Sequence, residues 1–151
     1  MKRVALILIV LQAFVYSLSA ADEDELKAVY RLMTEAAKTS NLELLASNIH
    51  PQALGFMRES QLAFQLKPGY GAQEVLPPFL ADMSRFMATP YDPVFRVVGN
   101  TGIVCIVTRF TPISKSKDQE RFNRATWVFT KEDGKWKLLS WHTSETPLKK
   151  K

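Results

Sequence analysis

The chain has 151 residues but only one cysteine and two histidines. A single cysteine, Cys105, cannot form a disulfide within the chain, and a lone cysteine in an apolar run is usually a small buried side chain. The histidines, His50 and His142, lie far apart in the sequence and do not have the spacing of metal ligands. We therefore expect a fold held together by its core, with no metal site, no cofactor and no nucleophilic cysteine.

The chain also has little net charge away from its two ends. Its formal net charge is +5, and Lys2, Arg3 and the three lysines at 149–151 match that excess. The segment between the ends is therefore nearly neutral, which argues against electrostatic capture of nucleic acid. A basic tail such as 149–151 can bind anionic lipid, but it is also typical of a solvated chain end.

Residues 1–21 have the pattern of a secretory signal peptide. Lys2 and Arg3 precede an apolar run, and small residues follow it. The run is shorter than the ~20 residues that a membrane-spanning helix needs, which favours a cleaved signal peptide. The alternative is an uncleaved membrane anchor. Because Ser19 and Ala21 fit the small-x-small rule, we expect cleavage before Asp22, or else before Ala20. The mature protein would then be secreted or periplasmic, and only an uncleaved leader would contact a membrane.

The segment after the leader begins with helical patterns. An acidic start at 22–25 suits a helix N-terminus, and Leu26, Tyr30 and Met33 recur at helical spacing. A capping box at 40–43 predicts a short second helix that continues to Ile49. Short strands are expected at 53–57 and 61–66. Residues 72–87 predict a helix that Pro77 and Pro78 interrupt, and that ends at 89–90.

Four strand patterns follow without an intervening helix, at Val94–Val98, Ile103–Phe110, Phe122–Thr130 and Trp136–Ser144. The last two flank Asp133 and Gly134, and glycine there supplies the positive φ that a short hairpin turn needs. Helices first and a meander last predict an α+β fold, in which a curved antiparallel sheet wraps a long N-terminal helix and short helices. No internal repeat or interdomain linker is present, so 22–148 forms one domain.

Three stretches have a recognisable pattern: the end of the first helix with 40–45, the hairpin at 96–104 (R-V-V-G-N-T-G-I-V), and the closing hairpin with D-G-K-W followed by W-H-T-S. Their order and spacing resemble the nuclear transport factor 2-like superfamily, and within it the SnoaL-like domains and the association domain of calcium/calmodulin-dependent kinase. The resemblance covers 22–148 and implies a cone-shaped sheet with a pocket. Enzymes of the superfamily, such as ketosteroid isomerase, use acidic, tyrosine and histidine side chains that face the cone.

Candidate site residues are the polar and aromatic side chains on the predicted elements. Tyr30 could donate a hydrogen bond to a carbonyl, or it could be an ordinary core tyrosine. His142 alternates with Ser140 and Ser144, and could act as a general base or serve a structural role. Met33, Trp127 and Phe129 would complete an apolar lining. Trp127 also stands where the kinase association domain is expected to place a pocket arginine.

Two further patterns bear on partners. Arg96, Arg109 and Arg124 lie on predicted strands, where two of them could hold a carboxylate if they shared the inner face, or else form ion pairs outside. Trp136, Leu138, Leu139 and Trp141 give the last strand apolar residues at both alternating positions, which predicts a homodimer.

The function expected from these residues is binding of a small apolar molecule in the cone cavity by an exported SnoaL-like domain. The alternatives are an acid–base isomerase, dehydratase or cyclase of the ketosteroid isomerase type, and an interaction module without a ligand. Convergence of Tyr30 and His142 in one cavity would favour the enzyme.

Overall fold

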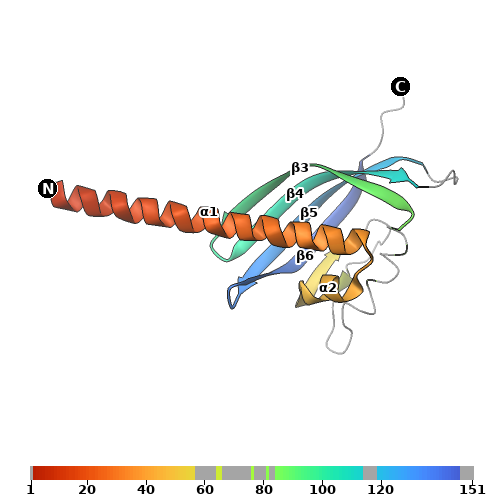
Figure 1. Ribbon diagram of the computed structural model, residues 1–151, viewed down its shortest axis with the longest axis horizontal. Helices are drawn as coiled ribbons and strands as arrows, with labels where there is room; N and C mark the ends of the chain where they lie inside the picture. The colour runs from red at the N-terminus through yellow and green to blue at the C-terminus, as the bar shows by residue number, and fades with distance from the viewer. Residues whose placement is uncertain are drawn as a thin grey trace, which may run out of the picture.

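The computed structural model describes residues 2–56, 64–65, 76, 81, 84–113 and 119–146, with side chains from residue 20 onward except at 64–65. A long helix crosses one face of a curved sheet, and its N-terminal half extends beyond the sheet (Figure 1). From residue 20 onward, no described helix is long and apolar enough to span a membrane. The long helix packed on a curved sheet confirms the predicted α+β fold. The elements are α1 Lys2–Lys38, α2 Leu42–Ser47, β1 Ile49–Phe56, β2 Phe64–Gln65, β3 Phe86–Val98, β4 Thr101–Pro112, β5 Arg121–Glu132 and β6 Lys135–Thr146.

The six strands form one sheet in the order β2-β1-β6-β5-β4-β3. The neighbours β3 to β6 are antiparallel, as predicted, and the tight turn at Asp133 and Gly134 has φ values of 48° and 73°. The pair β1 and β6 is parallel, which the prediction of an antiparallel sheet missed. Most of the chain separates these two strands, so no hairpin fixes their relative direction.

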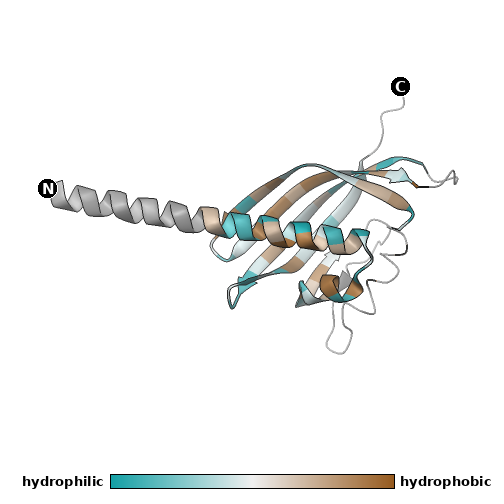
Figure 2. Cartoon of the chain, viewed as in Figure 1, coloured by the Kyte–Doolittle hydropathy of each residue, from teal (hydrophilic) through white to brown (hydrophobic). Residues whose placement is uncertain are grey.

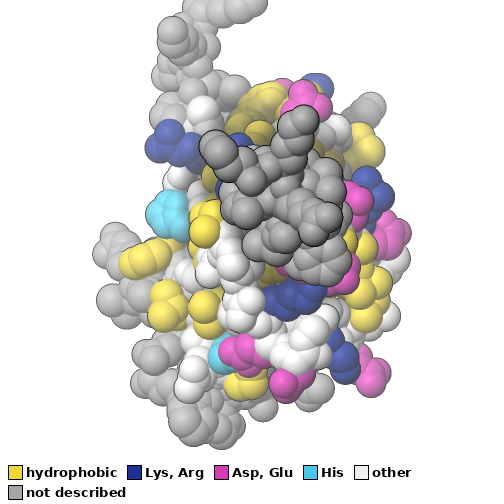
Figure 3. All heavy atoms as spheres, turned by 90° about the vertical axis from the view of Figure 1, so that its left-hand side faces the viewer, with side chains coloured by type: hydrophobic (Ala, Val, Ile, Leu, Met, Phe, Trp, Pro, Cys, Tyr) yellow, Lys and Arg dark blue, Asp and Glu magenta, His cyan; other side chains and the backbone are white. Residues whose placement is uncertain are grey.

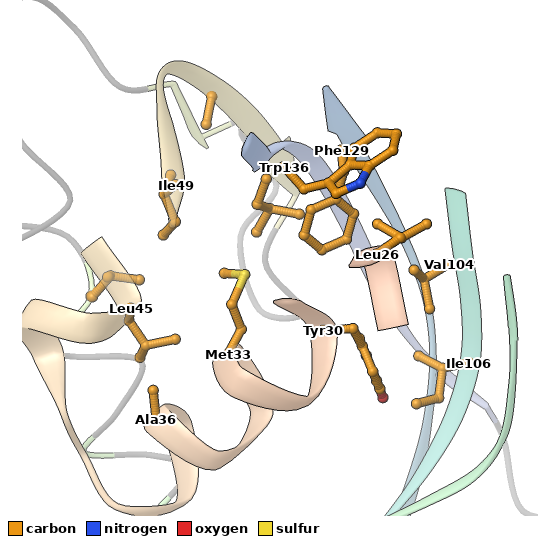
Figure 4. Close-up of a cluster of buried hydrophobic side chains, with 13 residues drawn as sticks. Leu26, Tyr30, Met33, Ala36, Leu45, Ile49, Val104, Ile106, Phe129 and Trp136 are labelled. Carbon is orange, nitrogen blue, oxygen red and sulfur yellow. The ribbon is translucent and has the colours of Figure 1, made fainter. Parts of the chain in front are cut away.

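The core lies between α1 and one side of the sheet, here called the inner face. Leu26, Tyr30, Met33 and Ala36 form one stripe along α1 and are buried. Figure 4 shows this stripe against side chains of β4, β5 and β6. Hydrophilic and hydrophobic residues alternate along the part of α1 that crosses the sheet (Figure 2), as expected for an amphipathic helix. Gly102 allows the close approach, because a Cβ atom there would lie 2.8 Å from a Leu26 methyl group.

Two of the predicted helix boundaries are wrong. The second helix ends at Ser47, and Ile49 belongs to β1. Phe86 to Pro90 lie in β3 and not in a helix ending at 89–90; the rest of 72–87 is outside the described residues, apart from positions 76, 81, 84 and 85. Pro90 and Pro93 fit this strand because β3 is at the sheet edge, where a missing backbone N–H leaves no partner unpaired.

The acidic cluster at 22–25 does not begin a helix, because α1 is continuous through it. Two of its carboxylates instead bind β5. Lys131 Nζ lies 2.6 Å from Asp22 Oδ1 and 2.5 Å from Glu25 Oε2. These bonds raise the pKa of Lys131 above 10.5. The cluster therefore fastens the middle of α1 to the sheet.

The apolar residues of β6 do not occupy both faces, as the sequence suggested. The register with β5 shifts between Val128–Ser140 and Phe129–Leu138, which makes Leu139 an extra residue. Such a β-bulge reverses the alternation of the strand. Trp136 and Leu138 before the bulge and Trp141 after it consequently share the inner face, where they pack with the core. The apolar surface opposite the core must come from other strands.

Candidate functional site

Four of the five predicted lining residues meet on the inner face. The ring centroids of Tyr30 and Trp127 are 5.5 Å apart, and those of Trp127 and Phe129 are 6.3 Å apart. Met33 belongs to the same cluster. Phe129 and Met33 are 0% and 2% exposed, so both lie within the core. Trp127 is only partly buried, which makes it the member of this group best placed to contact a ligand, and the Tyr30 ring packs against it.

The Tyr30 phenol is a hydrogen-bond donor by its environment. Burial raises its pKa from 10.0 to about 12, because the phenolate would lose its hydration. Its ring makes edge contacts with Phe95 and Trp127, each at 5.5 Å. Figure 4 shows the ring between α1 and β4, with the hydroxyl end beside Ile106. Tyr30 therefore stays protonated near neutral pH, where it can donate a hydrogen bond but cannot serve as a base.

His142 lies on the opposite side of the sheet, here called the outer face. It is paired in register with Thr126 of β5, and its ring is 5.8 Å from that of Phe56. Its side chain is exposed. Since the sheet separates His142 from Tyr30, the structure does not bring these two candidates together. Ser140 and Ser144, as predicted, share the face of His142.

The three strand arginines also point to the outer face. Arg96 is paired with Ile103 there and is exposed. Arg109 Nε donates to Glu120 Oε2 at 2.8 Å, and this ion pair raises the pKa of the arginine. Arg124 Nε donates to Ser144 Oγ at 3.0 Å. The structure thus agrees with ion pairs and outer positions for these arginines, and not with a carboxylate site on the inner face.

A shallow groove of about 470 Å³ crosses the outer face. Its lining residues come from β3, β4, β5 and β6, and most occupy outer positions: Tyr91, Asp92, Val94, Cys105, Val107, Arg124, Thr126 and His142. Ile106 and Ala125, which also border the groove, are inner positions of β4 and β5. Cys105, which the sequence placed in the core, is exposed in this groove. Figure 3 shows hydrophobic side chains next to a histidine at the surface, at the left of the view.

His50 has a structural role. Its Nε2 is 3.2 Å from Glu132 Oε2, and its Nδ1 accepts a hydrogen bond from the Gln52 backbone at 3.1 Å. The side chain thereby ties the start of β1 to the end of β5. Among the described residues, no group of three His, Cys, Asp or Glu side chains could hold a metal ion.

Asn123 is an inner-face residue that the sequence reasoning missed. It is 5% exposed, and its Oδ1 has no hydrogen-bond partner in the part of the chain that the structure describes. The signal was present in the sequence, because Asn123 lies in the same alternating positions of β5 as Trp127 and Phe129. A buried polar residue next to the apolar positions 125, 127 and 129 of the same face requires a hydrogen-bond partner.

Comparison with known proteins places this geometry in a family. Residues 26–149 match the model of the SnoaL-like domain. No curated protein matches the chain.

Solved structures show the same fold. An NTF2-like protein of unknown function from Pseudomonas putida KT2440 has a TM-score of 0.73 at 15% identity, over 87% of this chain and 92% of that one. The S. rosetta CaMKII hub has a TM-score of 0.67 at 17% identity, over 82% and 96%. The association domain of C. elegans CaMKII has a TM-score of 0.67 at 16% identity, over 83% and 97%.

Proposed function

The chain belongs to the SnoaL-like domain family, and from this premise we propose that it binds a small, mainly apolar molecule between α1 and the inner face of the sheet. The supporting observation is the partly exposed aromatic wall beside the Tyr30 phenol. Ala125, Trp127 and Trp141 pack against the core but are not fully covered by it. Apolar walls with one or two oriented polar groups are typical of small-molecule sites.

The same geometry does not support acid–base turnover by the pair Tyr30 and His142. An isomerase of the ketosteroid type needs a base near its hydrogen-bond donor. Tyr30 is a donor, and His142 lies across the sheet from it. The proposed ligand is therefore held by apolar contact with Trp127 and Trp141, while the phenol of Tyr30 sets its orientation by donating to an oxygen of the ligand.

A binding experiment with 2-methoxynaphthalene tests this site, because its ether oxygen can only accept a hydrogen bond. Tyr30→Phe removes the donor and keeps the aromatic wall. We expect it to weaken binding about fivefold, the usual effect of losing a neutral hydrogen bond of ~1 kcal/mol. Binding would be measured by equilibrium dialysis.

His142→Ala is the matched control for Tyr30→Phe, since it alters only the outer face. It should leave the dissociation constant unchanged. Equal affinity in the wild type and Tyr30→Phe would contradict the role of Tyr30. A loss in His142→Ala that exceeds the loss in Tyr30→Phe would place the ligand in the outer groove.

The outer face supports a second proposal, a homodimer formed through this surface. Its apolar side chains come from β3, β4 and β1, and several are more than half exposed: Val98 67%, Val94 61% and Met87 59%. Exposed apolar surface of this kind marks interaction sites. The similar CaMKII association domains support self-association. Asp92 and Arg124 line the groove with opposite charges, so two copies related by a twofold axis could pair them.

Export of the mature domain is the third part of the proposal. The leader pattern at 1–21 supports it. The described contacts of α1 with the sheet begin at Asp22 and Leu26. Removal of the leader before Asp22 would therefore leave the domain intact.

A further inference from the structure

Asn123 lies where the apolar core of the inner face ends. Going along β5, the inner positions are occupied by Phe129, Trp127, Ala125 and then Asn123. Its cross-strand neighbours are Thr108 on β4 and Glu145 on β6. Polar residues therefore lie side by side on three adjacent strands at this level.

The side-chain amide of Asn123 is buried, but its oxygen accepts no hydrogen bond from a described residue. The residue is 5% exposed, and none of the described residues bonds its Oδ1. A buried acceptor that lacks a donor destabilises the folded state, whereas an apolar side chain of similar size avoids this cost. A leucine would have nearly the same shape as Asn and would suit a face that also carries Trp127 and Phe129. An unpaired amide at this position therefore points to a donor that the described residues do not supply.

Tyr30 and Asn123 offer complementary hydrogen-bonding groups along the same face. The hydroxyl end of Tyr30 lies beside Ile106 (Figure 4), whose partner on β5 is Ala125. Asn123 is the next inner position beyond Ala125. The phenol donates and the amide oxygen accepts, so a ligand group that both accepts and donates fits between them.

We propose that Asn123 is the second polar anchor of the inner site and that it selects ligands carrying a hydroxyl or an amide N–H. This inference rests on the proposed ligand binding between α1 and the sheet. It narrows the ligand class to alcohols, phenols and amides, and disfavours ketones, ethers and esters. In these last three an oxygen could meet Tyr30, but no proton would reach Asn123 Oδ1.

Two probes that differ in one proton test the selection. 2-Naphthol can accept from Tyr30 and donate to Asn123, whereas 2-methoxynaphthalene can only accept. The wild type should bind 2-naphthol about fivefold more tightly, which is the expected effect of one neutral hydrogen bond. Asn123→Leu should bind the two probes with equal affinity and melt at the same temperature as the wild type or higher. Tyr30→Phe should weaken both probes and keep the preference.

Thr126→Val is the matched control, because it removes a hydroxyl from the outer face of the same strand. It should keep the preference for 2-naphthol. Asn123→Ser shortens the side chain and so moves the acceptor away from the ligand, and this variant should lose the preference for 2-naphthol. It serves as the test if the leucine variant folds poorly.

The outcomes separate this inference from the function on which it rests. If the wild type binds both probes equally, or if Asn123→Leu keeps the preference, Asn123 does not select the ligand and an ordered water satisfies its oxygen. If both Asn123 variants melt well below the wild type, the amide is structural and the inference is wrong. If neither probe binds the wild type, the proposed binding site itself fails.

Discussion

At the scale of single residues, Tyr30 is a titratable side chain that lies within the core. It is 5% exposed, and its ring makes edge contacts with Phe95 and Trp127. Burial raises its pKa to about 12, while the unfolded chain has a value near 10.0. Between these two values the unfolded state releases a proton that the folded state retains. Folding stability must therefore fall as the pH rises from 10 to 12, and it is unaffected by this group below pH 10.

We expect Tyr30→Phe to remove this alkaline loss of stability. Two pKa units correspond to up to about 3 kcal/mol. The free energy of unfolding would be measured by denaturant titration at pH 8 and pH 11.5 in the wild type and in Tyr30→Phe. The lysines also titrate in this range, but their contribution is the same in both proteins and cancels when the two pH dependences are subtracted. Tyr91→Phe, which removes an exposed phenol, is the control. Parallel pH profiles for the wild type and Tyr30→Phe would contradict the assigned pKa.

At the scale of elements, two β-bulges determine which side chains face the site. One makes Leu139 an extra residue in β6 and turns Trp141 inward. The other lies between Tyr91 and Val94 in β3, where Asp92 has φ 32°. Strand periodicity predicted the four strands of the meander and their turns, because alternation and glycine turns are local signals. The bulges, the parallel β1–β6 pair and the unpaired Asn123 depend on contacts distant in sequence, so periodicity could not supply them.

The parallel pair of β1 and β6 requires a glycine at position 55. A Cβ atom there would lie 2.3 Å from the Trp141 backbone oxygen. Backbone cannot shift as a side-chain end can, so we expect Gly55→Ala to destabilise the fold by about 3 kcal/mol, the upper range for overpacking. Gly134→Ala is the control; nothing lies within 4 Å, and only its φ of 73° opposes a side chain, at about 1 kcal/mol. Thermal unfolding would rank the destabilisation by the two variants. Equal destabilisation would mean that β1 can move away from β6 to accommodate the new methyl group.

At the scale of the whole molecule, the curved sheet presents two surfaces with different roles. The inner face holds the core and the proposed ligand, whereas the outer face leaves Val94, Val98 and Val107 exposed. The sequence predicted a homodimer from the wrong strand, since the two-sided pattern of β6 is a bulge. The outer face nevertheless has apolar surface, because Val94 and Val98 on β3 and Val107 on β4 occupy outer positions and are exposed.

Native mass spectrometry of the protein, produced with its leader in an exporting host, tests dimerisation and export together. We expect a dimer whose subunits begin at Asp22 or Ala20. Val94→Glu should raise the dimer dissociation constant at least about tenfold, because burying an unpaired carboxylate is costly. Leu32→Glu is the control, since Leu32 is 41% exposed on α1 and lies away from the outer face. A monomer, or equal weakening by both variants, would reject an interface at this face.

The subunit mass shows whether the leader at 1–21 has been cleaved, and the structure predicts how cleavage affects stability. Cleavage before Asp22 would create a helix N-terminus rich in carboxylates, where the helix dipole favours negative charge. Asp22 and Glu25 would still bind Lys131. The new terminus should therefore be as stable as the uncut chain, with equal melting temperatures for the mature domain and the full chain. A subunit that retains Lys2 and Arg3 after export would instead identify residues 1–21 as an uncleaved anchor.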